Sequence, residues 1–132
     1  MSIVSKDEIR EIGLEARLDI PEPLGYCYPA SKKIVKKLKN RYGLTDKQVF
    51  TKEVRVGKSG TIRHYVVQLK AKYVKDSDYS GSLLIDVTLD QYCDENLQEN
   101  RNEGGVRTSF GSKSNINKVN IYEFGRAPYR NT

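Results

Sequence analysis

The sequence predicts an α+β fold, and three patterns carry this prediction. Apolar residues recur at helical spacing after Cys27, two alternating segments flank a glycine-containing turn at 57–60, and a short apolar run surrounds Asp86. The chain has 132 residues, of which 37% are hydrophobic and 30% charged, as in a single domain with a well-solvated surface. We therefore expect one domain over 1–132, with helices packed on an antiparallel sheet.

The N-terminal part of the chain predicts one short helix followed by a break. Residues 6–18 show an imperfect amphipathic pattern, which indicates a helix interrupted near Gly13. Residues 20–25 contain two prolines, which lack an amide proton and bias the preceding residue toward extended geometry. This segment should approach the next element as a rigid, non-helical linker.

A second helix is predicted over residues 28–42. Its apolar residues lie on one side and its lysines on the other, Pro29 suits its first turn, and Gly43 suits a left-handed end. Cys27 therefore stands at the N-terminus of this helix.

Alternating residues predict a hairpin in the middle of the chain. Residues 49–56 alternate apolar and polar side chains, and 57–60 supply the turn. The return strand, 61–73, places His64 on one face and Tyr65 on the other.

The second half of the chain predicts two more strands. Residues 83–88 form a buried strand that Asp86 interrupts, and a last strand is expected over about 118–124. Between them, about 94–118 is polar and predicts a long loop, while 125–132 predicts a tail.

Charge and composition limit the partners. The net charge of +6 and the pI near 9.3 favour an anionic partner, such as an acidic protein or peptide. Nucleic acid is less favoured, because the basic helix lacks the interleaved aromatic residues or glycine loop of such modules. The charge is concentrated in that helix, at Lys32, Lys33, Lys36, Lys37, Lys39 and Arg41, and a solvated outer face is the simpler interpretation.

The sequence favours a cytoplasmic protein without cofactor or metal. It has no run of about 18 apolar residues and no signal-like N-terminus, so we expect no membrane contact. Two thiols alone do not make a zinc site, and a reducing compartment disfavours a disulfide between Cys27 and Cys93. Acidic neighbours disfavour a thiolate at Cys93, which we interpret as structural or incidental.

Three residues form a candidate catalytic set. A helix N-terminus favours the thiolate of Cys27, and its unpaired amides could hold an oxyanion. His64 is the single histidine and so the one available imidazole base, and Asp86 in the next strand could orient it. A shift or bulge in strand pairing is needed to place these two opposite each other.

Each of the three also has a structural interpretation. Cys27 could be a core residue, His64 a satisfied strand residue, and Asp86 a turn cap. Their common order along the chain and the helix start favour the catalytic interpretation.

The local sequences around the three residues resemble the papain-like superfamily in its transglutaminase-like branch. Gly25–Ser31 is similar to the nucleophile segment, His64–Val67 to the histidine strand, and Ile85–Tyr92 to the aspartate segment. The resemblance implies a catalytic core at about 24–92, with Cys27 as nucleophile, His64 as base and Asp86 as the orienting residue.

This resemblance implies acyl transfer through a thioester. We expect a small cysteine protease or isopeptidase acting on a protein or peptide, with glutamine deamidation or transamidation as an alternative. A non-enzymatic basic module that binds nucleic acid or an acidic protein is the alternative from another class.

Overall fold

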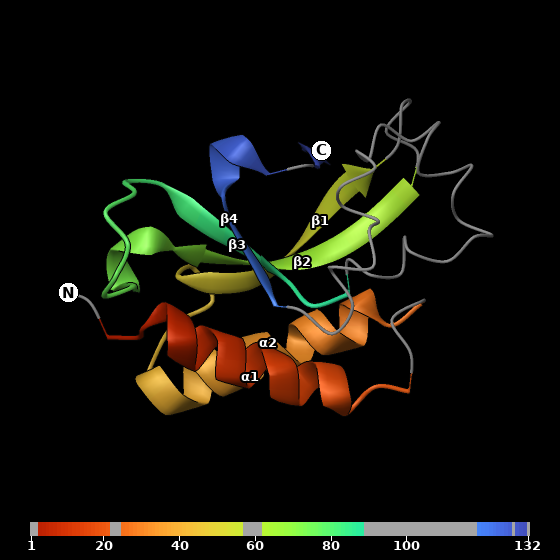
Figure 1. Ribbon diagram of the computed structural model, residues 1–132, viewed down its shortest axis with the longest axis horizontal. Coiled ribbons are helices and arrows are strands. Elements are labelled where there is room, and N and C mark those ends of the chain that lie inside the picture. The colour runs from red at the N-terminus through yellow and green to blue at the C-terminus, as the bar shows by residue number, and fades with distance from the viewer. Residues whose placement is uncertain (1–2, 22–24, 57–61, 89–118, 128, 132) are drawn as a thin grey trace.

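The computed structural model describes residues 3–21, 25–56, 62–88, 119–127 and 129–131, and has an α+β fold. Figure 1 shows both helices on one side of an antiparallel sheet. The helices are α1 (Lys6–Leu18) and α2 (Cys27–Tyr42). The strands are β1 (Val49–Val56), β2 (Ile62–Lys70), β3 (Ser82–Asp86), β4 (Asn120–Glu123) and β5 (Arg130–Asn131), with 3-10 turns η1 (Ala71–Tyr73) and η5 (Phe124–Arg126). The predicted fold class is confirmed at this level.

Helix α1 is continuous, so the predicted interruption at Gly13 is wrong. A capping box starts the helix, because the Ser5 hydroxyl accepts from the Glu8 amide and the Glu8 carboxylate accepts from the Ser5 amide. The absence of a side chain at Gly13 matters for packing instead. A Cβ at this position would lie 2.8 Å from Val119 Cγ1 and 3.1 Å from Val87 Cγ1. The glycine thus permits a close approach of α1 to the segments that follow β3 and precede β4.

The five strands of the described residues form one sheet in the order β4-β3-β2-β1-β5. Every pairing is antiparallel, and the predicted β1/β2 hairpin is confirmed. In the β2/β3 ladder, Val67 lies opposite Ile85. Side chains alternate between the two faces of a strand, so His64 and Asp86 belong to the face opposite to these two residues.

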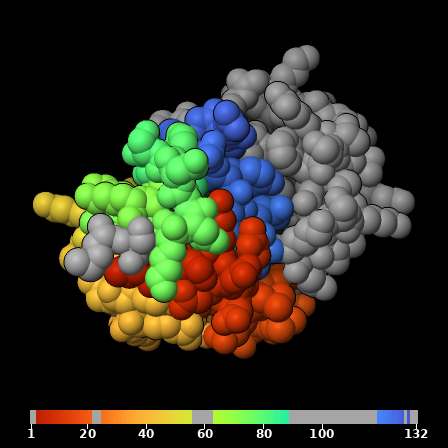
Figure 2. Space-filling model, turned by 60° about the vertical axis from the view of Figure 1, so that its left-hand side comes forward, coloured from red at the N-terminus to blue at the C-terminus, as the bar shows by residue number. Residues whose placement is uncertain are grey.

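Strand β2 ends at Lys70, three residues before the predicted end. The 3-10 turn η1 follows directly, and the N-terminal segment pairs with the residues at the end of this turn. The amides of Ile3 and Val4 donate to the Tyr73 carbonyl, and the Lys75 amide donates to the Val4 carbonyl. Figure 2 shows the red N-terminal residues packed beside the green segment after β2.

The predicted strand over 83–88 also ends early, at Asp86. The side chain of this residue accepts a hydrogen bond from the Thr88 amide at 3.0 Å, which turns the main chain out of the ladder. Asp86 is therefore both the last residue of β3 and the start of a turn.

The predicted tail at 125–132 is wrong, because it contains the end of η5 and all of β5. Strand β5 pairs with Val54 and Arg55 of β1. Tyr129, just before β5, is 8% exposed. A two-residue strand carries no alternation, so its sequence could not predict a long-range pairing.

Apolar clusters cover both faces of the sheet. The larger lies between the helices and the sheet and contains Ile9, Ile12, Ala30, Ile34, Leu38, Val49, Val67, Leu69, Leu83 and Ile85 among others. The smaller lies on the opposite face and contains Val54, Val66, Leu84 and Tyr129, with Tyr122, Phe124 and Ala127 packed against it. None of the helices described here is long and apolar enough to cross a membrane.

Candidate active site

Cys27 is the first residue of α2, as the sequence predicted to within one residue. Gly25 enters the turn before the helix with φ 80°, which favours glycine. Tyr26 is the N-cap and makes no side-chain capping bond, while its carbonyl accepts from the Ala30 amide. The amides of Cys27 and Tyr28 therefore have no acceptor within the helix and can serve an incoming oxyanion.

The first turn of α2 is fixed to the main chain of β2 at Tyr65. The Ser31 hydroxyl donates to the Tyr65 carbonyl at 3.1 Å, and the main chain of Tyr65 lowers the pKa of the Cys27 thiol. The rings of Tyr28 and Tyr65 meet edge to face with centroids 4.9 Å apart. Because the β2/β3 ladder begins at Val67, Tyr65 lies beyond it and its peptide groups are available to α2. The thiol is thus held at the edge of β2.

His64 and Asp86 meet inside the protein. His64 Nε2 lies 2.7 Å from Asp86 Oδ2, and the two residues are 0% and 1% exposed. The expected shift or bulge is not needed. With Val67 opposite Ile85, the two residues are diagonal neighbours on one face, within reach of side chains of this length.

The side chains of His64 and Cys27 also interact, because the imidazole lowers the pKa of the thiol and the thiol raises the pKa of the imidazole. The structure therefore brings together all three residues that the sequence singled out, in the order Cys27, His64, Asp86. Their catalytic roles stay a prediction.

Two further residues hold the carboxylate, and the sequence did not identify them. The Tyr129 hydroxyl donates to Asp86 Oδ2, the oxygen that also meets His64, and the Thr88 amide donates to Oδ1. Thr88 could have been suspected from its place two residues after an aspartate. Tyr129 could not, because its approach depends on the pairing of β5 with β1.

Cys27, His64 and Asp86 shift one another's pKa values, mostly toward the charged forms. Burial lowers the pKa of His64, but the Asp86 carboxylate and the thiol outweigh it and raise this pKa to about 10. Burial raises the pKa of Cys27, but the hydrogen bond and charge of His64 and the Tyr65 amide lower it overall. Burial likewise raises the pKa of Asp86, and His64, Tyr129 and the Thr88 amide lower it overall. Near neutral pH, His64 is therefore an imidazolium. It interacts with the Asp86 carboxylate and with a Cys27 thiol whose pKa is lowered.

Much of the basic charge on α2 is neutralised by neighbouring carboxylates. Three of its lysines form ion pairs: Lys33 with Asp19, Lys37 with Glu15 and Lys39 with Asp46. These contacts support the interpretation of the helix as a solvated outer face.

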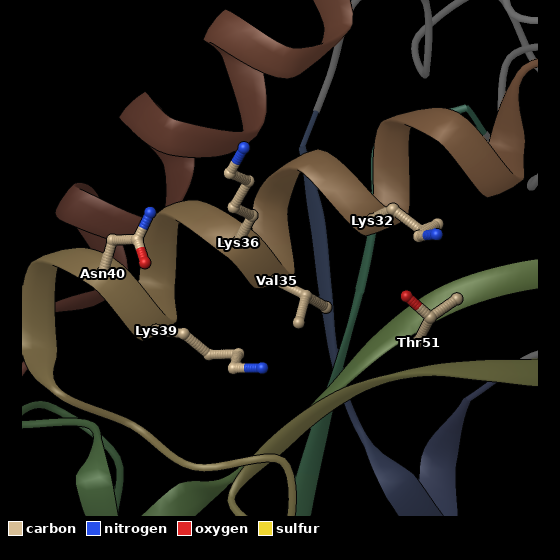
Figure 3. A pocket seen from close by; sticks show the side chains of 6 residues that line it. All are labelled: Lys32, Val35, Lys36, Lys39, Asn40 and Thr51. Atoms are coloured by element: carbon tan, nitrogen blue, oxygen red, sulfur yellow. The ribbon is translucent and has the colours of Figure 1, made fainter.

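A hollow of about 230 Å³ lies along the flank of α2 that faces β1. Its lining residues are Lys32, Val35, Lys36, Lys39, Asn40 and Thr51. Figure 3 shows Lys32, Val35 and Lys39 directed toward Thr51, whereas Lys36 points away from it. The Lys32 ammonium lies 5.2 Å from the centroid of the Tyr28 ring. This flank carries three lysines, Lys32, Lys36 and Lys39.

The chain matches no family model, no curated protein and no solved structure. The site must therefore be judged on its own geometry. Cys93 and the predicted loop at 94–118 lie outside the described residues. Within the described ranges, no group of three or more His, Cys, Asp and Glu side chains could hold a metal ion.

Proposed function

We propose that this protein is a cysteine-dependent acyl-transfer enzyme, acting as a small protease or isopeptidase through Cys27, His64 and Asp86. One observation carries the proposal. The single histidine lowers the pKa of a thiol at the start of α2, and its Nε2 lies 2.7 Å from a buried carboxylate. This arrangement is the one that nucleophile, base and orienting group require. The fold we propose for it is a papain-like core of the transglutaminase-like type, on the resemblance of the local sequences.

The reaction begins with the Cys27 thiolate. Its sulfur attacks the carbonyl carbon of an amide, and the carbonyl electron pair moves to oxygen to give a tetrahedral oxyanion. Imidazolium His64 gives its proton to the leaving nitrogen as the carbon–nitrogen bond breaks, and an amine and a thioester result. Water then attacks the thioester and gives a proton to neutral His64. Loss of the sulfur from the new tetrahedral intermediate releases the acid and restores the Cys27 thiolate and the His64 imidazolium.

The first turn of α2 is suited to stabilise the oxyanion. The amides of Cys27 and Tyr28 have no helical acceptor, and the positive end of the helix dipole lies beside them. A glutamine side chain can form the same thioester with release of ammonia. Water would then complete a deamidation, and an amine would complete a transamidation.

Selective labelling tests the proposal without a known substrate. Under limiting iodoacetamide near neutral pH, Cys27 should be alkylated much faster than Cys93, because His64 and the helix dipole favour its thiolate. Peptide mapping measures the two rates. Equal labelling, or faster labelling of Cys93, would remove Cys27 from the nucleophile role.

A non-enzymatic basic module is the second candidate, favoured by the lysine-lined hollow beside α2. Lys32 and Lys36 are both exposed, so Lys32→Glu with Lys36→Glu should leave the melting temperature nearly unchanged. On this second hypothesis, the double variant loses an anionic partner that binds wild type in a salt-dependent manner, and Cys27→Ala keeps it. Lys47→Glu with Lys70→Glu is the matched control, because both residues are exposed and the charge change is the same.

A further inference from the structure

Tyr129 takes part in the hydrogen-bond network of Asp86 from a segment remote in sequence. It is 8% exposed, and its hydroxyl donates to Asp86 Oδ2 across 43 residues of chain. Its ring lies 5.6 Å from the His64 ring, measured between centroids, at an interplanar angle of 42°. The phenol therefore contacts both members of the buried pair.

The geometry of the carboxylate shows what this contact does. His64 and Tyr129 both meet Oδ2, while the Thr88 amide donates to Oδ1. Donors on both oxygens oppose rotation about the bond that carries the carboxylate. A fixed carboxylate in turn fixes the plane of the imidazole, and so directs its second nitrogen at Cys27.

The pairing of β5 with β1 places Tyr129 next to Asp86. Within the described residues it spans two residue pairs, at Val54 and Arg55 of β1. Tyr122 supports the phenol from β4, with ring centroids 6.0 Å apart and planes at 86°. The position of the hydroxyl thus depends on a short strand that comes after the rest of the sheet in sequence.

We propose that Tyr129 is a positioning residue that locks the Asp86 carboxylate and through it the orientation of His64. The proposal rests on the proposed function for its effect on turnover. It makes the last described strand part of the active site, which is otherwise built from α2, β2 and the end of β3.

Tyr129→Phe removes the hydroxyl and keeps the ring that packs in the smaller cluster. The matched control is Tyr42→Phe, which removes a phenol hydroxyl that donates to the Glu8 carboxylate, away from Asp86 and His64. Folding of both variants is checked by circular dichroism. A third variant, Tyr129→Ala, removes ring and hydroxyl together.

The single histidine permits a direct readout that needs no substrate. Nitrogen-15 NMR of the imidazole reports on His64 alone, because the chain contains one histidine. In Tyr129→Phe the proton on His64 Nε2 should exchange with water several-fold faster and its shift should move, while Tyr42→Phe keeps the wild-type spectrum. A role in packing alone would leave the His64 signals of Tyr129→Phe unchanged, since the ring is retained.

Kinetics supply the second readout on any substrate cleaved in a Cys27-dependent manner. Tyr129→Phe should lower kcat by roughly 3- to 30-fold with KM nearly constant, because a hydrogen bond to a charged group is lost away from the substrate. Wild-type kcat and wild-type His64 signals in a folded Tyr129→Phe would overturn the proposal. If every activity that the protein shows survives in Cys27→Ala, the proposed function fails instead, and the NMR result still decides whether Tyr129 positions His64.

Discussion

Replacing Asp86 by asparagine tests the buried pair on which the proposed chemistry depends. The substitution keeps the size of the side chain and removes its charge. Asp86 is 1% exposed and accepts hydrogen bonds from His64, Tyr129 and the Thr88 amide. An asparagine has one acceptor oxygen, so its NH₂ group must face at least one of these donors.

The cost follows from burial. Breaking a buried ion pair by removing one partner typically costs about 3–5 kcal/mol, because the remaining charge is uncompensated. An unfolding entropy of about 2.1 cal/mol/K per residue gives roughly 0.28 kcal/mol/K for this chain. The melting temperature should therefore fall by roughly 10–18 °C. This is a large part of the stability of about 5–15 kcal/mol that such domains have.

The pH dependence separates the ion pair from simple packing. The pKa of His64 is raised to about 10 from its ordinary 6.5, so its contribution is complete below pH 6.5 and is lost as pH rises toward 10. The pKa of Asp86 is lowered from 3.8, so its contribution is present above pH 3.8 and is lost as pH falls through the lowered value. The difference between wild type and Asp86→Asn should be largest between these limits.

Thermal unfolding followed by circular dichroism at about pH 5.5 and about pH 9 measures this difference. Asp78→Asn is the control, because Asp78 is exposed and its replacement should cost no more than about 0.5 kcal/mol. If Asp86→Asn is too unstable to fold, the double variant with His64→Gln should recover part of the loss, since it removes both charges. A melting temperature of Asp86→Asn equal to that of wild type at both pH values would refute the reasoning.

Two further predictions concern reactivity and packing. His64→Ala should raise the pKa of Cys27, slow its alkylation at about pH 6–7 and abolish turnover; a folded variant with wild-type alkylation and activity would contradict the catalytic assignment. Gly13→Ala should lower stability by about 1 kcal/mol in urea unfolding, although alanine favours a helix, because the new methyl group would lie 2.8 Å from a methyl of the stiff Val119 side chain. An increase in stability would show that α1 can move away at little cost.

The sequence alone determined the elements with strong local periodicity. Helix α2 follows from its apolar stripe, and Gly43 ends it with φ 68°, as expected of a left-handed end. The β1/β2 hairpin follows from alternation around a turn. Cys27 at a helix start, with His64 and Asp86 on successive strands, could be selected from residue types and order, because each type has few chemical uses.

Only the tertiary structure decided how these elements meet. The register of β2 and β3 makes His64 and Asp86 diagonal neighbours, and register depends on the packing of both faces rather than on either strand. The approach of Val119 explains why a glycine suits position 13 inside helix α1. The two residues are more than 100 positions apart in the sequence. Tyr129 reaches Asp86 through the pairing of β5 with β1, which leaves no periodic signal in a two-residue strand. Local propensity determines helices and strands, whereas contacts between distant segments determine which side chains share a buried site.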